Sequence, residues 1–166
     1  ANVSNTPYRM YKHWVHEGGI STPFIAYWPA QIKESRIDRR MGHVNDLMAT
    51  CCELAQIDYP SQYKGVSIIP TQGKSLVPVL LNQPDTLYDN RVLFWEHMGN
   101  KAVRKGNMKL VMANEDKEWK LYNITNDRNE ESDISEEATE TYKEMIQMYQ
   151  QWAEKAGALE WDEISR

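Results

Sequence analysis

The chain has 166 residues, of which 41% are hydrophobic and 26% charged, with six Trp and nine Tyr. This is the composition of an ordinary globular chain, and it excludes a disordered one. The net charge of −5 gives little attraction to nucleic acid or to an anionic membrane, so we expect neither as a partner.

Residues 23–28 form a short apolar run between Pro23 and Pro29. A continuous apolar run without alternation is typical of a strand that is covered on both faces. Such a strand needs neighbours, so we expect the N-terminal unit to be poorly ordered alone, or to pack against another molecule.

A helix is predicted next, at about residues 43–56. Apolar residues recur there at helical spacing, and Asn45 and Asp46 suit its first turn. The apolar stripe includes Cys51, which we interpret as a small buried hydrophobic residue rather than a reactive thiol. Cys51 and Cys52 are adjacent, a geometry that disfavours a disulfide between them, so no disulfide framework is expected.

Residues 57–90 contain four prolines and little periodicity. They indicate a long loop with a short helical turn near Ser75–Leu81, and this loop is the best candidate boundary between structural units. We therefore divide the chain into residues 1–88 and residues 89–166.

Four strand-like segments follow, separated by turn residues: Arg91–Glu96, Ala102–Arg104, Lys109–Met112 and Trp119–Ile124. They predict a small antiparallel meander with one buried face. A last helix is predicted after Ser135, which could cap it, and it ends at Gly157. Its Met and aromatic stripe most simply packs on the meander.

The sequence carries no motif of a self-contained active site. The chain has no Gly-rich phosphate loop, nucleophile elbow or paired-cysteine zinc pattern. His13 and His16 are three residues apart, but a third ligand is not evident. The sequence therefore favours a pair of solvated or hydrogen-bonded histidines over a metal site.

The most distinctive pattern is Lys12 followed by Glu17-Gly18-Gly19 and a Pro-led apolar run. It resembles a segment of the sulfatases, and further matches follow in collinear order. These are His43–Thr50, Gly73–Leu80, Trp95–Val111, Trp119–Asn123 and the acidic Asp127–Glu131. Ala49 stands where much of the family has Pro, and Ser21 stands where many members have Arg. The chain is thus similar to the C-terminal portion of an arylsulfatase-like protein of the alkaline-phosphatase superfamily.

This resemblance implies an α+β chain. It would be the end of an α/β sulfatase domain followed by a small four-stranded antiparallel sheet packed by a C-terminal helix. Residues 1–88 would then be the remnant of the large domain, and residues 89–166 the small subdomain.

The resemblance also implies hydrolysis of a sulfate ester by a formylglycine, made from Cys or Ser in a Cys/Ser-x-Pro-x-Arg motif, with a calcium ion. We find neither the formylglycine motif nor the calcium ligands in this chain. After Cys51, for example, Glu53 and Ala55 stand where the motif needs Pro and Arg. We expect the nucleophile and the calcium ligands upstream of Ala1, and expect this chain alone to be inactive.

By the same resemblance, Lys12 is the catalytic residue, because the matching lysine of the family contacts a sulfate oxygen. An ammonium group there stabilises charge that develops as the sulfur–oxygen bond breaks. The expected substrate contacts are His97, foremost, with Glu96, Asn100 and Arg104 on the small sheet. No metal ligand is assigned. Glu17 and the two glycines are expected to shape the turn that presents Lys12.

Three functions remain open on the sequence. The first is a fragment of a sulfatase that acts on sulfated carbohydrates or aryl sulfates. The second is a phosphodiesterase or phosphonate hydrolase of the same superfamily. The third is a stand-alone, non-catalytic glycan-binding module. Expected partners are the upstream sulfatase portion or a second copy, bound through the exposed N-terminal unit, and a sulfated small molecule or glycan. The family implies a periplasmic, secreted or lysosomal location.

Overall fold

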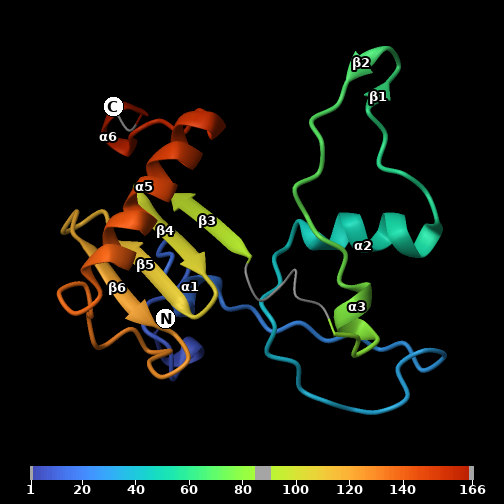
Figure 1. The fold of residues 1–166 in the computed structure, drawn as a ribbon, viewed down its shortest axis with the longest axis horizontal. Helices are drawn as coiled ribbons and strands as arrows, with labels where there is room; N and C mark the ends of the chain where they lie inside the picture. Colours follow the sequence, from blue (N-terminus) through green and yellow to red (C-terminus); the bar gives the residue numbers. More distant parts are fainter. Residues whose placement is uncertain (1, 85–90, 165–166) are drawn as a thin grey trace. The chain divides into compact units, whose positions relative to one another are not determined.

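The computed structural model describes residues 2–84 and 91–164 (Figure 1). The chain forms two compact units: residues 1–23 join residues 90–166 in one, and residues 24–89 form the other. These units cut across the division into 1–88 and 89–166, which stays a prediction about the domains of a complete enzyme. In the described part, no helix is long and apolar enough to cross a membrane.

The first unit is built on a four-stranded antiparallel sheet in the order β3-β4-β5-β6. The strands are β3 (Val92–His97), β4 (Asn100–Lys105), β5 (Met108–Met112) and β6 (Trp119–Asn123). Each joins the next through a short connection, so the predicted meander is confirmed. The register pairs Val103 with Leu110 and Leu110 with Leu121, which sets the apolar side chains side by side on one face.

Helix α5 (Thr139–Ala156) covers that face. Its Met145 and Tyr149 are buried against Val103, Leu110 and Leu121. Alternate strand residues point to opposite faces, so the helix stripe and one set of strand residues form a continuous core.

Of the two predicted ends of this helix, the C-terminal one is confirmed and the N-terminal one is wrong. Gly157 ends it in the left-handed region at φ 68°, as expected. Ser135 as the helix cap is wrong, since the helix begins at Thr139 after Ala138. The Ser135 N–H bonds to Asp133 Oδ1 and the Ala138 N–H bonds to the Ile134 carbonyl, so residues 134–138 form a preceding turn.

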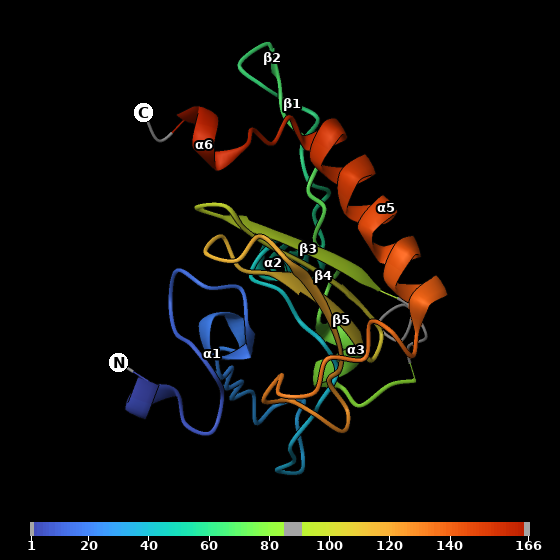
Figure 2. The same ribbon diagram turned by 90° about the vertical axis from the view of Figure 1, so that its left-hand side faces the viewer.

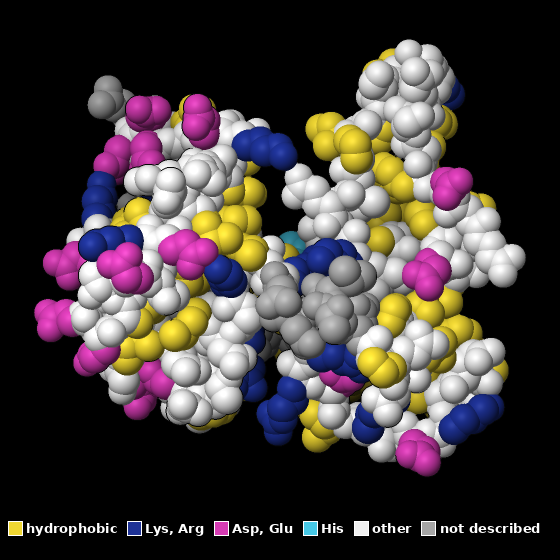
Figure 3. Space-filling view, in the orientation of Figure 1, with side chains coloured by type: hydrophobic (Ala, Val, Ile, Leu, Met, Phe, Trp, Pro, Cys, Tyr) yellow, Lys and Arg dark blue, Asp and Glu magenta, His cyan; other side chains and the backbone are white. Residues whose placement is uncertain are grey.

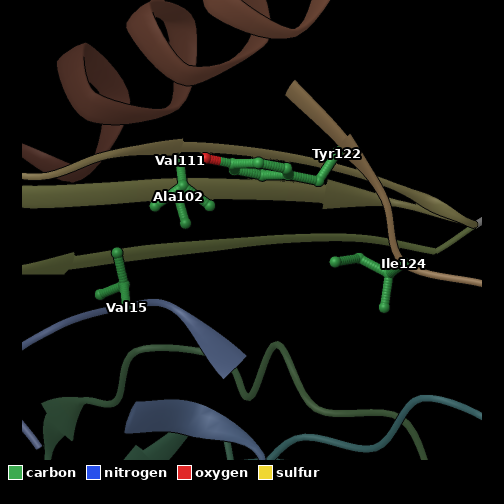
Figure 4. Close-up of a cluster of buried hydrophobic side chains, with 5 residues drawn as sticks. All are labelled: Val15, Ala102, Val111, Tyr122 and Ile124. Carbon is green, nitrogen blue, oxygen red and sulfur yellow. The ribbon is translucent and has the colours of Figure 1, made fainter. Parts of the chain in front are cut away.

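The opposite face of the sheet is covered by the N-terminal residues (Figure 2). They carry a single 3-10 turn, η1 (Asn2–Asn5), and one short helix, α1 (Glu17–Ile20). Val15 is buried under the sheet in a cluster with four residues of the strands and of the turn after β6 (Figure 4): Ala102, Val111, Tyr122 and Ile124. Both faces of the sheet are therefore covered, where the sequence predicted one.

The second unit contains α2 (Asp46–Ala55), a two-residue hairpin of β1 (Gln62–Tyr63) and β2 (Val66–Ser67), and α3 (Val77–Leu80). The predicted helix and the helical turn are confirmed, and the hairpin was not predicted. Asp46 is fully buried, and its carboxylate accepts the N–H groups of His43 and Lys74 at 2.7 and 2.9 Å. It therefore ties the start of α2 to the segment before α3.

Two predictions for this unit are wrong. Residues 23–28 form no strand, and Phe24, Ile25 and Tyr27 are exposed. Cys51 is exposed too, as is most of the apolar stripe of α2. A strand needs paired neighbours and an apolar stripe needs a covering element, and the described residues of this unit supply neither. Hydrophobic side chains consequently gather on its surface (Figure 3).

The C-terminal residues form α6 (Trp161–Ile164) in the first unit. Lys101 of β4 contacts the Glu160 carboxylate at 2.7 Å just before this helix, and Lys117 pairs with Asp162. These ion pairs join the last described residues to β4 and to the loop between β5 and β6.

Candidate functional site

Lys12 is exposed and lines a surface pocket of about 410 Å³ in the first unit. The other lining residues all come from the N-terminal part of the chain: Asn5, Tyr11, Gly18, Gly19, Ser21, Thr22 and Pro23. The pocket therefore places the predicted catalytic lysine beside the two glycines of its motif, and Ser21 lies in the same wall.

The segment that carries Lys12, residues 8–20, folds back on itself and is called the Lys12 segment below. A side-chain Cβ at Gly18 would lie 2.1 Å from the Arg9 carbonyl oxygen, and one at Gly19 would lie 1.9 Å from that of Trp14. Only glycine permits so close an approach of two backbones. The Gly18 N–H also bonds to the Arg9 carbonyl at 3.1 Å, which closes the fold.

His13, directly after Lys12, lies beside the β3–β4 turn. Its ring stacks on that of His97 with centroids 5.8 Å apart, and its Nδ1 lies 3.2 Å from Met98 Sδ. The His13 backbone is in the left-handed region at φ 95°, which is uncommon for a residue with a side chain. The structure thus brings the predicted substrate contact His97, which is exposed, next to the neighbour of Lys12.

Two other predicted substrate contacts, Glu96 and Asn100, make hydrogen bonds to the backbone of the β3–β4 turn. The Glu96 carboxylate accepts the Gly99 N–H at 3.0 Å. Asn100 is buried, and its amide donates to the carbonyls of His13 and His97 at 2.9 and 3.0 Å. Asn100 therefore binds the Lys12 segment to the turn, with its polar atoms engaged by the protein.

A buried charge cluster lies between the Lys12 segment and the sheet, formed by Glu17, Lys109 and Glu130. The Lys109 ammonium lies 2.9 Å from a Glu17 oxygen and 2.8 Å from a Glu130 oxygen. The Glu17 N–H donates to the second Glu130 oxygen at 2.8 Å. Lys109 and Glu130 are 0% exposed and Glu17 is 1% exposed, so these contacts are shielded from water.

Two arginines border this cluster. Arg104, predicted as a substrate contact, pairs directly with Lys109 across β4 and β5, and its guanidinium lies 3.9 Å from Glu17. Arg128 lies 3.5 Å from the other Glu17 oxygen and donates to the Ser21 hydroxyl at 3.1 Å. Glu17 therefore has three cations around it.

The two buried carboxyls respond differently to this setting. Burial by itself raises the pKa of Glu17, but the Lys109 ammonium, Arg104 and Arg128 together outweigh it and hold that pKa below its usual value. For Glu130, burial prevails over the attraction of Lys109, and the pKa of its carboxyl is raised. The surroundings of Glu17 therefore stabilise the ionised form of its carboxyl group.

His16 lies in the same segment and is buried. Burial, with the nearby charges of Lys109 and Arg9, lowers its pKa to about 4, so the ring is neutral at neutral pH. The two histidines thus lie in different environments, since His13 is exposed and His16 is buried. No group of three His, Cys, Asp or Glu side chains converges within residues 2–84 and 91–164. Calcium does not fit the donor sets of these residues.

Sequence reasoning missed Lys109 and Glu130. A signal existed for Lys109, because it shares a strand face with the apolar Val111 and lies in an otherwise apolar strand. Glu130 lies in the acidic run 127–131, which has the composition of a solvated loop, so its burial has no local signal.

Comparisons with known proteins agree with the resemblance to sulfatases. The family model described as N-sulphoglucosamine sulphohydrolase, C-terminal, matches residues 8–156. An uncharacterized sulfatase of Schizosaccharomyces pombe is 26% identical over 163 residues, which cover 96% of this chain and 29% of that protein. N-acetylgalactosamine-6-sulfatase of Homo sapiens is 32% identical over 89 residues, 51% of this chain and 17% of that protein. The chain thus spans less than a third of the length of these relatives.

Solved structures share the fold. Ps i-CgsB, solved in complex with k-i-k-neocarrahexaose, aligns with a TM-score of 0.52 at 20% identity, covering 65% of this chain and 23% of that one. A 2-O GAG sulfatase aligns with a TM-score of 0.50 at 20% identity, covering 68% and 25%. The family match over residues 8–156 establishes that this chain belongs to the sulfatase family, as a C-terminal portion within the alkaline-phosphatase superfamily.

Proposed function

We propose that this chain is the C-terminal part of an enzyme that hydrolyses sulfate esters, and that Lys12 binds a sulfate oxygen of the substrate. The observation that carries the proposal is the placement of Lys12 at a pocket whose wall is made by the glycines of its own motif. The exposed cation is held by a segment whose backbone is tightly folded. A preorganised cation is what a developing negative charge requires.

In this proposal the Lys12 ammonium acts by charge alone. It attracts the sulfate on binding, and it stabilises the added negative charge on the oxygens as the ester bond breaks. The nucleophile, proposed to be a formylglycine, and the calcium ion would be supplied by a part of the complete enzyme outside these residues. This chain alone is therefore proposed to be inactive.

The substrate is proposed to be a sulfated sugar. His13, the residue after Lys12, forms a stacked pair of exposed rings with His97, and such rings offer both an apolar face and polar nitrogens to a sugar. Two similar proteins are named for the same class of compound: N-acetylgalactosamine-6-sulfatase and a 2-O GAG sulfatase.

Kinetics of the complete enzyme test the role of Lys12. Lys12→Ala should lower kcat/KM for a chromogenic aryl sulfate by about 100-fold or more, since one lost oxyanion partner typically costs this much. The matched control is Lys143→Ala, which removes an exposed lysine of α5 whose contact with Glu140 is also exposed. Equal activity of the two variants would refute the assignment of Lys12.

A further inference from the structure

The charge cluster joins parts of the chain that are far apart in sequence. Lys109 of β5 binds Glu17 across 92 residues, and Glu130 binds the Glu17 N–H across 113 residues. The Arg9 guanidinium also donates to the Glu130 main-chain carbonyl. Both ends of the Lys12 segment, at Arg9 and at Glu17, are thus attached to the loop after β6.

Joining two surfaces through buried charges has a large free-energy cost. Removing each ion from water costs several kcal/mol, which the mutual attraction repays only when the geometry is well defined. Apolar packing of equal volume is often as stable as a buried ion pair. The cluster therefore does more than stabilise the fold: it fixes the position of the Glu17 backbone relative to the sheet.

That position also determines where Lys12 lies. The Gly18 N–H bonds to the Arg9 carbonyl, and the Trp14 N–H bonds to the Tyr11 carbonyl, so Lys12 lies within a loop closed on both sides. Val15, between Lys12 and Glu17, is buried under the sheet in Figure 4. A shift at Glu17 would therefore be transmitted to Lys12 through a short and tightly folded stretch of backbone.

We propose that Lys109 and Glu130 are positioning residues for Lys12: they hold the Lys12 segment on the sheet in the arrangement that presents the ammonium group to sulfate. This rests on the proposed role of Lys12. Neither residue touches the substrate in this account, and each acts only through the segment that it anchors. A misplacement of about 1 Å at a reacting group can cost on the order of 100-fold in rate.

A double-mutant cycle in the complete sulfatase tests the proposal. We expect Lys109→Met to lower kcat/KM for an aryl sulfate about 10- to 100-fold when Lys12 is present. In the Lys12→Ala background the same change should cost less than about 3-fold, because the group that it positions is gone. Lys105→Met is the matched control, since Lys105 is half-exposed and pairs with the exposed Glu144, and it should change kcat/KM less than about 2-fold.

A loss of the same size in both backgrounds would overturn the proposal, because that loss would not pass through Lys12. Where Lys109→Met does not fold, Glu130→Gln takes its place in the cycle. It keeps an oxygen for the Glu17 N–H and removes the charge that attracts Lys109. The same ratio of losses is expected, and equal losses in both backgrounds would again contradict it.

Hydrogen exchange on the 166-residue chain separates failure of this inference from failure of the proposed function. Lys109→Met should speed exchange of the Trp14, Glu17 and Gly18 amides by about 10-fold or more, with the β4 and β5 amides unchanged. If Lys12→Ala leaves the enzyme fully active, the sulfate role of Lys12 is refuted, while faster exchange still supports the anchoring. Unchanged exchange in the Lys12 segment would overturn the anchoring itself.

Discussion

Of the two glycines in the Lys12 segment, Gly19 makes the closer approach to another stretch of backbone. Its missing Cβ leaves room for the Trp14 carbonyl, and an added methyl group would force one of the two backbones to move. We expect Gly19→Ala to lower the free energy of unfolding by about 2–4 kcal/mol, measured by urea denaturation.

Gly42→Ala provides the comparison. A Cβ there would meet nothing closer than Leu76 Cδ2 at 3.7 Å, an ordinary contact. A cost under about 1 kcal/mol is expected for it. Similar costs for the two variants would show that the close approach at Gly19 does not constrain the segment.

His16 predicts a dependence of stability on pH. Its pKa in the folded chain is about 4, whereas in the unfolded chain it is about 6.5. As pH falls through this window the unfolded state takes up a proton that the folded state does not, so stability is lost. Between about pH 7 and about pH 4.5 this single group should remove about 2 kcal/mol.

The measurement is urea unfolding at both pH values for the native chain and for His16→Gln, which has no titrating group. The difference in unfolding free energy between the two chains should change by about 2 kcal/mol over the window. A difference that is independent of pH would mean that His16 takes up its proton equally in both states.

Residues of the site differ in how far the sequence predicts them. The Lys12 motif and its glycines were singled out because they resemble a segment of the sulfatases and lie within eight residues of one another. Asn100 and Arg104 were predicted to meet substrate, which stays a prediction, and the structure adds their contacts with the Lys12 segment and with Glu17. Contacts between residues 87 or more positions apart leave no local signal in the sequence. For the same reason the role of Glu130 was not predicted.

At the scale of elements, α5 and the sheet form the core that local pattern predicts best. Strand alternation and helix periodicity each mark one apolar face, and the two faces pack together. Met145 is at the centre of this contact and is 0% exposed. We expect Met145→Ala to cost about 2–5 kcal/mol, measured by urea unfolding of the whole chain.

Gln147→Ala is the control on the same helix, because Gln147 is exposed and alanine favours helix. Its effect should stay within about 0.5 kcal/mol. Should Met145→Ala prove equally mild, α5 would not depend on this contact with the sheet.

Residues 23–28 show where local pattern fails. Their composition favours a strand covered on both faces, yet a strand exists only where another strand accepts its hydrogen bonds. The start of α5 was misplaced for a related reason: Ser135 is a good cap by type, but Asp133 and Ile134 hold that stretch as a turn. Both errors come from partners that composition does not reveal.

At the scale of the whole molecule, α2 presents an uncovered apolar surface in its unit. Leu47, Met48 and Leu54 are exposed on it. We expect the isolated chain to self-associate through this face, and Met48→Lys with Leu54→Lys to weaken that association at least about 10-fold, measured by analytical ultracentrifugation.

Glu53→Lys controls for added positive charge on the same helix, since Glu53 is exposed and polar. It should leave the association within about 3-fold of the native value. A chain that stays monomeric at all concentrations would contradict the expected role of this face.

The most direct test of the account is hydrolysis of a chromogenic aryl sulfate, with calcium, by this chain mixed with the separately expressed upstream portion of a sulfatase. Co-elution in size exclusion would first show that the two have assembled. The account predicts no hydrolysis by the chain alone, hydrolysis by the assembled pair, and a loss of about 100-fold or more when the chain carries Lys12→Ala. Hydrolysis by the chain alone, or full activity of the assembly with Lys12→Ala, would contradict it.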